Sequence, residues 1–332
     1  MTRLALRRGT VTAVHGAELT VDVAGEERSA LSFGEMTGTV EVGDEVVVNV
    51  SAVELGLGSG GFDIVHVNLT RGLGGGVGEA HVMKLNYTSL QHPVQPVEES
   101  APPSLDIAGK PVAVIALHGQ LPCVAWAATQ ARRDARVGYV QTAGGALPGS
   151  LSRVVRRLLD AGLLAGHITA APAFGAPHEA ISTPGAVHAG LTALECDAAI
   201  VGPGPGILGS ATTLGHGGLA ALENAHAALA LGAKTIVVPR MSSGDPRERH
   251  SGLSHHTETV LEMMLRPALV ALPAGAVFAL PGEHEARAAE TDLDGYRTSG
   301  LPASTMGRGI DEDELFFRAS LAGGAVLAEE IA

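Results

Sequence analysis

The larger, C-terminal part of the sequence repeats one pattern, and this repetition constrains the fold more than any other feature. A short run rich in valine and isoleucine leads into a polar or glycine-containing loop, and then into a segment whose apolar residues have helical spacing. The runs are "PVAVIALH" (111–118), "RVGYVQTAGG" (136–145), "DAAIVG" (197–202) and "KTIVVPR" (234–240). Continuous apolar strands that alternate with helices are typical of a mostly parallel sheet covered on both faces. We therefore expect a Rossmann-like α/β domain over residues 106–332.

The N-terminal part has a different periodicity. "GTVTAVHGAELTVDVAG" (9–25) and "GTVEVGDEVVVNV" (38–50) alternate apolar and polar residues around glycine turns, which is typical of short strands in a small all-β domain. Residues 1–70 are therefore expected to form a β-barrel-like domain. Residues 71–105 begin rich in glycine and end rich in proline, which predicts a linker or extended segment.

Charge and cysteine content exclude several classes of protein. The net charge is −13 and only 17% of residues are charged, so a wide positive footprint for nucleic acid or for an anionic membrane is not expected. The longest apolar run, residues 268–280, is too short to span a bilayer. Cys123 and Cys196 have no metal-like spacing, and a reducing, cytoplasmic environment is the simplest interpretation.

The most unusual segment is "PRMSSGDPRERHSGLSHHTETV" (239–260), where charged, imidazole and hydroxyl side chains crowd together. Its arginines are suited to bidentate binding of an anion, and Asp245 with His255 is the most favoured proton-transfer pair. The expected ligand contacts in this segment are Arg240, Arg247, Arg249, His250, Ser254 and His256. A merely solvated polar loop is the alternative.

The same histidines raise the question of a metal. His255 and His256 are adjacent, so on a helix their side chains diverge by about 100°, and we expect at most one of them to share a ligand sphere with His250. Structural zinc normally has four closely spaced ligands, and no cysteine is near. We therefore assign no metal ligand, and keep a metal-dependent hydrolase using His250, His255 and Asp245 as an alternative.

A second loop, "VGPGPGILGSATTLGHGG" (201–218), lies between an expected strand and an expected helix. Glycines there would let backbone N–H groups approach a phosphate. As a dinucleotide fingerprint the loop is poor, because two prolines interrupt it and Arg240, rather than an acid, follows the next strand. The expected ligand contacts are Gly202, Gly204, Gly206, Gly209 and Thr212. A loop that only turns a tight corner is the alternative.

Polar residues also follow the other expected strands. His118 ends the first strand and is a reserve candidate for catalysis, while Thr305, Met306, Gly307 and Arg308 are expected to return to the same crevice. Because the carboxyl ends of parallel strands meet at one edge, all these segments are predicted to converge there. Residues 283–295, "EHEARAAETDLDG", are expected to be solvated surface only.

Three motifs together resemble a known family. "GPGPG" (202–206), "DPRERHSGLSHHT" (245–257) and "STMGRG" (304–309) are similar to the bacterial family known as domain of unknown function 3866. The resemblance runs over most of the chain, and the long central motif is specific. It implies no established activity, substrate or catalytic residue.

The sequence therefore favours a protein that binds a small anionic metabolite, phosphorylated or nucleotide-like, at the sheet edge. If it is an enzyme, hydrolysis or group transfer fits better than redox chemistry, because the dinucleotide fingerprint is poor. An alternative is a non-catalytic assembly or RNA-associated protein that works through the β domain. A homo-oligomer is compatible with the sequence, no membrane partner is expected, and the sequence identifies no cofactor.

Overall fold

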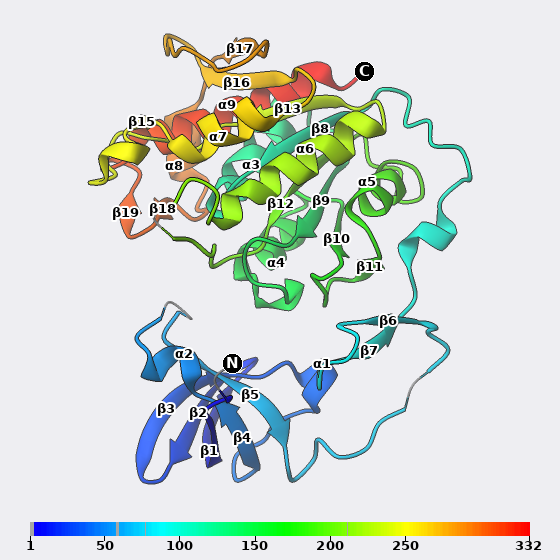
Figure 1. The fold of residues 1–332 in the computed structure, drawn as a ribbon, viewed down its shortest axis with the longest axis vertical. Coiled ribbons are helices and arrows are strands. Elements are labelled where there is room, and N and C mark those ends of the chain that lie inside the picture. Colours follow the sequence, from blue (N-terminus) through cyan, green and yellow to red (C-terminus); the bar gives the residue numbers. More distant parts are fainter. Residues whose placement is uncertain (1–2, 58–59, 77, 211) are drawn as a thin grey trace. The chain divides into compact units, whose positions relative to one another are not determined.

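The computed structural model describes residues 3–57, 60–76, 78–210 and 212–332 (Figure 1). The chain forms two compact units, Met1–Pro93 and Val94–Ala332. The first contains a closed β-barrel and the second an α/β sheet domain, so the predicted fold class is confirmed.

The barrel of the first unit closes in the order β1-β2-β3-β5-β4. Its pairs are antiparallel except for the parallel pair β3–β5. Alternate side chains, such as those of Val21, Val46 and Val48, point inward and are fully buried. Gly9 permits the close approach of β1 to β2, because a Cβ there would lie 2.7 Å from the Asp22 carbonyl oxygen. The strands are β1 (Leu6–His15), β2 (Glu18–Val23), β3 (Glu26–Leu31), β4 (Glu45–Asn49) and β5 (Asp63–Asn68).

A buried carboxylate secures one side of the barrel. Asp44 is 1% exposed and accepts hydrogen bonds at 2.9 Å from the Glu41 amide, Asn68 Nδ2 and Arg71 Nε. Burial would raise the pKa of Asp44, but the hydrogen bonds from Glu41, Asn68 and Arg71 outweigh it, so the pKa lies below its ordinary value. The barrel is thus stabilised by an ionised carboxylate as well as by its apolar core. Short elements complete this unit: α1 (Gly34–Thr37), α2 (Ser51–Glu54), β6 (Val82–Lys84) and β7 (His92–Val94), the last of which ends at the first residue of the second unit.

The second unit is built on an eight-stranded sheet with the order β11-β10-β9-β12-β8-β13-β16-β17. Every neighbouring pair is parallel. Of the strands of this sheet, β12 is the fifth in chain order, yet it lies between β9 and β8. The strands are β8 (Pro111–Ile115), β9 (Val137–Thr142), β10 (Gly166–Ala170), β11 (His178–Ala180), β12 (Ala198–Pro203), β13 (Lys234–Val238), β16 (Leu269–Pro273) and β17 (Glu285–Ala289).

Helices cover both faces of this sheet, as Figure 1 shows. Successive residues of β8 face opposite sides: Ala113 and Ile115 pack with α3 and α9, whereas Val112 and Val114 pack with α5 and α6. This alternation explains why the central strands are apolar throughout. The helices are α3 (Leu121–Ala131), α4 (Arg153–Asp160), α5 (Thr183–Leu191), α6 (Ala220–Ala230), α7 (His255–Met263), α8 (Leu293–Thr298) and α9 (Glu314–Glu330).

The prediction that residues 283–295 form only solvated surface was incomplete. Residues 283–295 contain β17, which adds an edge strand to the sheet, and the start of α8. Four of the five side chains of β17 are at least partly exposed, so its sequence has the composition of a surface loop. Pairing with β16, rather than burial, makes this segment a strand. Within the described ranges, no helix combines the length and the apolar character needed to cross a bilayer.

Candidate functional site

The segment that follows β13 folds back on itself before α7 begins. Two short strands, β14 (Met241–Ser242) and β15 (Gly252–Leu253), pair antiparallel and close the loop between them. The Ser254 side chain caps α7 by accepting from the His256 amide, which is a favoured arrangement at a helix start. The base of the loop is fixed to α7 because the Arg240 amide donates to Thr257 Oγ1 at 2.9 Å.

Asp245 organises the arginines of this loop. Arg247 donates to its carboxylate through both Nε (2.9 Å) and Nη2 (2.8 Å). Arg240 donates through Nη2 at 3.2 Å, and Arg308 through Nη2 at 3.4 Å. The side chains of Asp245 and Arg240 are 0% and 4% exposed, whereas that of Arg247 is 41% exposed. One buried carboxylate therefore orients three guanidinium groups, and one of these opens to solvent.

The C-terminal motif returns to this cluster, as the sequence predicted. Arg308 belongs to a hairpin of β18 (Ser304–Thr305) and β19 (Arg308–Gly309), and its Nε donates to the buried Asp313 at 3.0 Å. Met306 Sδ accepts from Arg240 Nη2 at 3.6 Å. Asp313 also accepts from Ser242 Oγ at 2.8 Å. Among the described residues, three guanidiniums thus face two carboxylates, which leaves one positive charge in excess.

Beside the arginines, four imidazole rings lie in contact. The rings of His216 and His256 are stacked, with centroids 3.6 Å apart and planes 10° from parallel. The centroid of His255 is 4.4 Å from that of His256 and 5.6 Å from that of His216. His250 is 4.9 Å from both His255 and His256. Although His255 and His256 are adjacent on α7, the rings of both lie against His250 and His216. That at most one of them shares a ligand sphere with His250 stays a prediction.

His216 belongs to the glycine loop, so the two loops meet as predicted, although through a residue that was not expected. It is 6% exposed and lies at the end of this loop, directly before the turn that precedes α6. Gly218 makes the approach possible, because a Cβ there would lie 3.0 Å from His216 Nδ1 and 3.3 Å from His256 Nδ1. Among the described residues, neither ring nitrogen of His216, nor His255 Nε2, has a hydrogen-bond partner of ordinary geometry.

Burial keeps these rings neutral. Burial, together with the smaller effect of neighbouring positive charges that include Arg240, lowers the pKa of His250 to about 3 and that of His256 to about 2. The pKa values of His216 and His255 are also lowered, again mainly by burial. Burial lowers the pKa of Arg240 to about 10, against the attraction of Asp245. At neutral pH the site therefore presents neutral imidazoles beside charged guanidiniums.

The same electrostatics change the role expected for Asp245. Its hydrogen bonds with Arg247 hold its pKa far below the ordinary value, although burial acts in the opposite direction. A carboxylate that is this hard to protonate is a weak general base at neutral pH. The metal-dependent alternative that used Asp245 as a ligand is also disfavoured, because three arginines already occupy its oxygens.

The glycines of the β12 loop divide into two groups. Gly202 and Gly204 are needed for packing, because added Cβ atoms would meet the Ile115 carbonyl oxygen at 2.7 Å and Gln141 Nε2 at 2.6 Å. Gly206 has φ of +74° with open space around it, and Gly209 is exposed and bridges to His216. Thr212 is exposed and bonded to Ser210. Only the exposed part of the loop is free to meet a ligand.

His118 lies in a different set of contacts. Its Nε2 is 2.7 Å from Ser152 Oγ, and its Nδ1 is 3.4 Å from the Tyr139 hydroxyl. Burial lowers the pKa of His118 to about 4. Ser152 caps α4 by accepting from the Val155 amide. These contacts give His118 a packing role between β8, β9 and α4.

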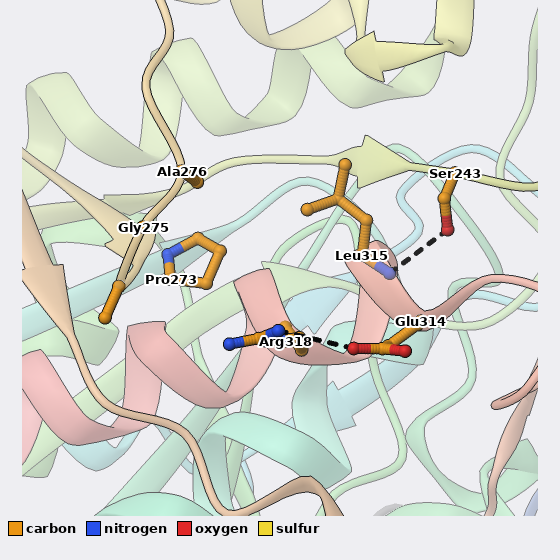
Figure 2. Close-up of a pocket in the computed structure, with 8 residues that line it drawn as sticks. Ser243, Pro273, Gly275, Ala276, Glu314, Leu315 and Arg318 are labelled. Atoms are coloured by element: carbon orange, nitrogen blue, oxygen red, sulfur yellow. Dashed lines mark hydrogen bonds and ion pairs between the residues drawn. The ribbon is translucent and has the colours of Figure 1, made fainter.

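A pocket of about 500 Å³ opens beside the arginine loop, between Ser243, the end of β16 and the start of α9. Figure 2 shows Ser243 Oγ accepting from the Leu315 amide at 3.3 Å, and Arg318 paired with Glu314 at 3.3 Å. Its size suits a small ligand. Its lining is otherwise apolar and its ion pair is neutral, so the chemistry that favours an anion lies in the arginine–histidine cluster.

The sequence missed two members of this site. His216 was hidden in a glycine-rich loop, and its only signal was the run "GHGG" (215–218), where small residues flank an imidazole. Asp313 was hidden in the acidic run "DEDE" (311–314), in which composition alone does not single out the buried acid.

Comparison with known proteins gives a family but no activity. The model of the family described as Protein of unknown function (DUF3866) matches residues 29–324, and the resemblance of the motifs is thereby confirmed. No curated protein matches the chain. Among solved structures, the crystal structure of YjeQ from Thermotoga maritima is 14% identical with a TM-score of 0.16, covering 50% of this chain and 51% of that chain. The chain thus spans about half of that structure.

Proposed function

Because the chain belongs to the family described as Protein of unknown function (DUF3866), which specifies no activity, we propose a function from the site itself. The protein binds a small anionic metabolite, phosphorylated or nucleotide-like, at the carboxyl edge of the sheet in its second unit. The observation that carries this proposal is the excess positive charge around Asp245, in a chain whose net charge is −13.

The exposed arginines supply the contacts. Asp245 holds Arg247 through two hydrogen bonds, so this guanidinium is oriented before a ligand arrives and loses little conformational freedom on binding. Arg249 is exposed and, within the described part of the chain, has no carboxylate partner. Two such groups match the oxygens of a phosphate in a bidentate manner.

The outer part of the glycine loop completes the proposed surface. Gly209 forms a backbone bridge with His216, whose ring stacks on that of His256, so the exposed part of the loop is attached to the histidine cluster. Gly202 and Gly204 keep the loop in place by packing. The reaction class that fits is hydrolysis or group transfer, because no acid stands where a dinucleotide ribose would be bound.

The proposal is tested with the full chain and a panel of inorganic phosphate, nucleotides and sugar phosphates. A ligand that binds the folded state raises the melting temperature by mass action, and its Kd is then measured by calorimetry. Each hydrogen bond to a charged group contributes about 1.5–3 kcal/mol, so Arg247→Ala should raise Kd by about 10- to 100-fold.

A matched control separates a specific effect from loss of charge. Arg297 on α8 has a side chain 42% exposed, close to the 41% of Arg247, and it pairs with Asp294. Arg297→Ala removes the same charge outside the site and should leave Kd unchanged. Equal affinities in the two variants, or no stabilisation by any compound in the panel, would contradict the proposal.

A further inference from the structure

In the cluster of His216, His250, His255 and His256, several buried ring nitrogens lack a hydrogen-bond partner among the described residues. The ligand atoms of His216, His255 and His256 all lie within 4.8 Å of one another. His216 is 6% exposed, and among the described residues neither of its ring nitrogens, nor the buried His255 Nε2, has a hydrogen-bond partner of ordinary geometry. The Thr213 backbone lies close to His216 and raises its pKa against the larger effect of burial. Each buried polar atom without a partner is unfavourable. A neutral imidazole offers one lone pair, so His216 and His255 together point to a missing partner that accepts a lone pair from each ring.

We infer that His216, His255 and His256 bind one divalent transition-metal ion, most favourably zinc, and leave one coordination position open toward the arginines. Three imidazole nitrogens with a water as fourth ligand are a typical zinc set, and imidazole ligands select against magnesium and calcium. This inference deepens the proposed function, because the open position would take an oxygen of the anionic metabolite or a water beside it.

The distances require a modest rearrangement. With bonds near 2.05 Å, nitrogens in a tetrahedral zinc site are about 3.4 Å apart. Because the ligand atoms all lie within 4.8 Å of one another, no gap has to close by more than roughly 1.4 Å. A metal lies in the plane of each imidazole that binds it, so the stacked rings of His216 and His256 must turn away from parallel. His250, whose Nδ1 is 2.8 Å from Ser254 Oγ, does not belong to the group of converging ligand atoms and is a neighbour rather than a ligand.

The arginines make metal binding depend on an anion. Arg240 Nη1 is 3.2 Å from His256 Nδ1. A dication at the three histidines is therefore repelled by this buried guanidinium, and the Arg240–His256 hydrogen bond has to open before His256 can bind the ion. An oxyanion between the ion and Arg247 compensates both charges. Metal and anion should therefore strengthen one another's binding by the same factor.

The test uses the full chain freed of metal with EDTA and titrated with Co²⁺, whose visible absorption reports the coordination of the ion. Zinc is then added to displace it. We expect one ion per chain, and binding at least about fivefold tighter with sulfate present, as coupling between sites usually reaches that size. His216→Ala and His255→Ala should each weaken binding by at least roughly 100-fold, since changes to groups that only orient metal ligands reach that size.

His15→Ala is the matched control, because His15 is an exposed imidazole in β1 of the barrel. It should leave Co²⁺ affinity unchanged. His255 is only half-buried, so His255→Ala should retain the fold even if His216→Ala does not. The fluorescence of Trp126 verifies folding of each variant. Wild-type chain that takes up no Co²⁺, or variants at His216 and His255 that bind it as wild type does, would overturn the inference.

Failure of the inference and failure of the proposed function give different results. Anion binding is measured separately on the EDTA-treated chain and on Arg247→Ala. If the EDTA-treated chain binds an anion through Arg247 but no Co²⁺ is bound, the metal site is refuted and the anion site stands. Metal bound with no effect of sulfate refutes the open position toward the arginines.

Discussion

Replacing Asp245 by asparagine removes the negative charge around which the site is arranged. Removing one partner of a buried ion pair costs about 3–5 kcal/mol, because the other charge is left without compensation. Of the three arginines, only Arg240 is fully buried, with a side chain 4% exposed, whereas Arg247 and Arg308 are 41% and 17% exposed. We therefore expect the lower end of that range, a loss of about 3 kcal/mol in the free energy of unfolding of the second unit.

Equilibrium unfolding in urea measures this loss. Trp126 is the single tryptophan of the chain and is buried in α3, so its fluorescence reports the second unit alone. Asp294→Asn is the control: its side chain is 90% exposed and pairs with Arg297 at the surface. An exposed pair of this kind contributes about 1 kcal/mol or less, so the two variants should differ by about 2 kcal/mol.

A double variant checks the physical cause. Arg240→Met combined with Asp245→Asn removes the buried positive charge together with its partner, and should recover part of the stability lost in the single variant. If Asp245→Asn unfolds at the same urea concentration as Asp294→Asn, Asp245 does not compensate a buried charge and the electrostatic account of the site fails.

The remaining predictions concern the barrel and the glycine loop. Asp44→Asn should destabilise the first unit by about 1.5–3 kcal/mol, measured by hydrogen exchange of its strands. Because the folded pKa of Asp44 is lowered, its contribution is complete above the unfolded pKa near 3.9 and is lost as pH falls through the folded value; equal wild-type and variant profiles would contradict this. Gly202→Ala forces a Cβ against Ile115 and should cost about 3 kcal/mol, whereas Gly206→Ala, in open space at φ +74°, should cost only about 1 kcal/mol. The urea midpoints of Trp126 fluorescence decide, and a reversed order would show that Gly202 is not a packing residue.

The sequence predicted the architecture because its strongest signals are local. Strand-forming runs such as "KTIVVPR" and the alternating barrel segments carry their structure in their own periodicity. The position of β12 between β8 and β9 cannot be predicted from the residues of β12 itself. It depends on pairing between strands that are far apart in the sequence. β17 was missed for the opposite reason: it is an edge strand with little burial, so its residues do not have an apolar pattern.

The site was predicted in part for the same physical reasons. The arginine–histidine segment is unusual in composition, and Arg240, Asp245 and Arg247 do cluster. His216 was not found because its partners come from another loop, and no pattern within its own segment indicates a ring stack. The glycines were misleading, because a glycine required by a neighbouring backbone and a glycine required by a ligand look identical in sequence.

The order of strands in the sheet has a consequence for how the chain acquires its structure during synthesis. The apolar strand β8 pairs only with β12 and β13, both of which leave the ribosome later. Roughly 80 residues separate β8 from β12 in the chain, which at 5–20 residues per second is about 4–16 s. For that time the nascent second unit carries a wholly apolar strand without either of its neighbours in the sheet. The centre of the sheet can therefore form only after β12 and β13 have been synthesised, whereas β9, β10 and β11 can pair with one another earlier.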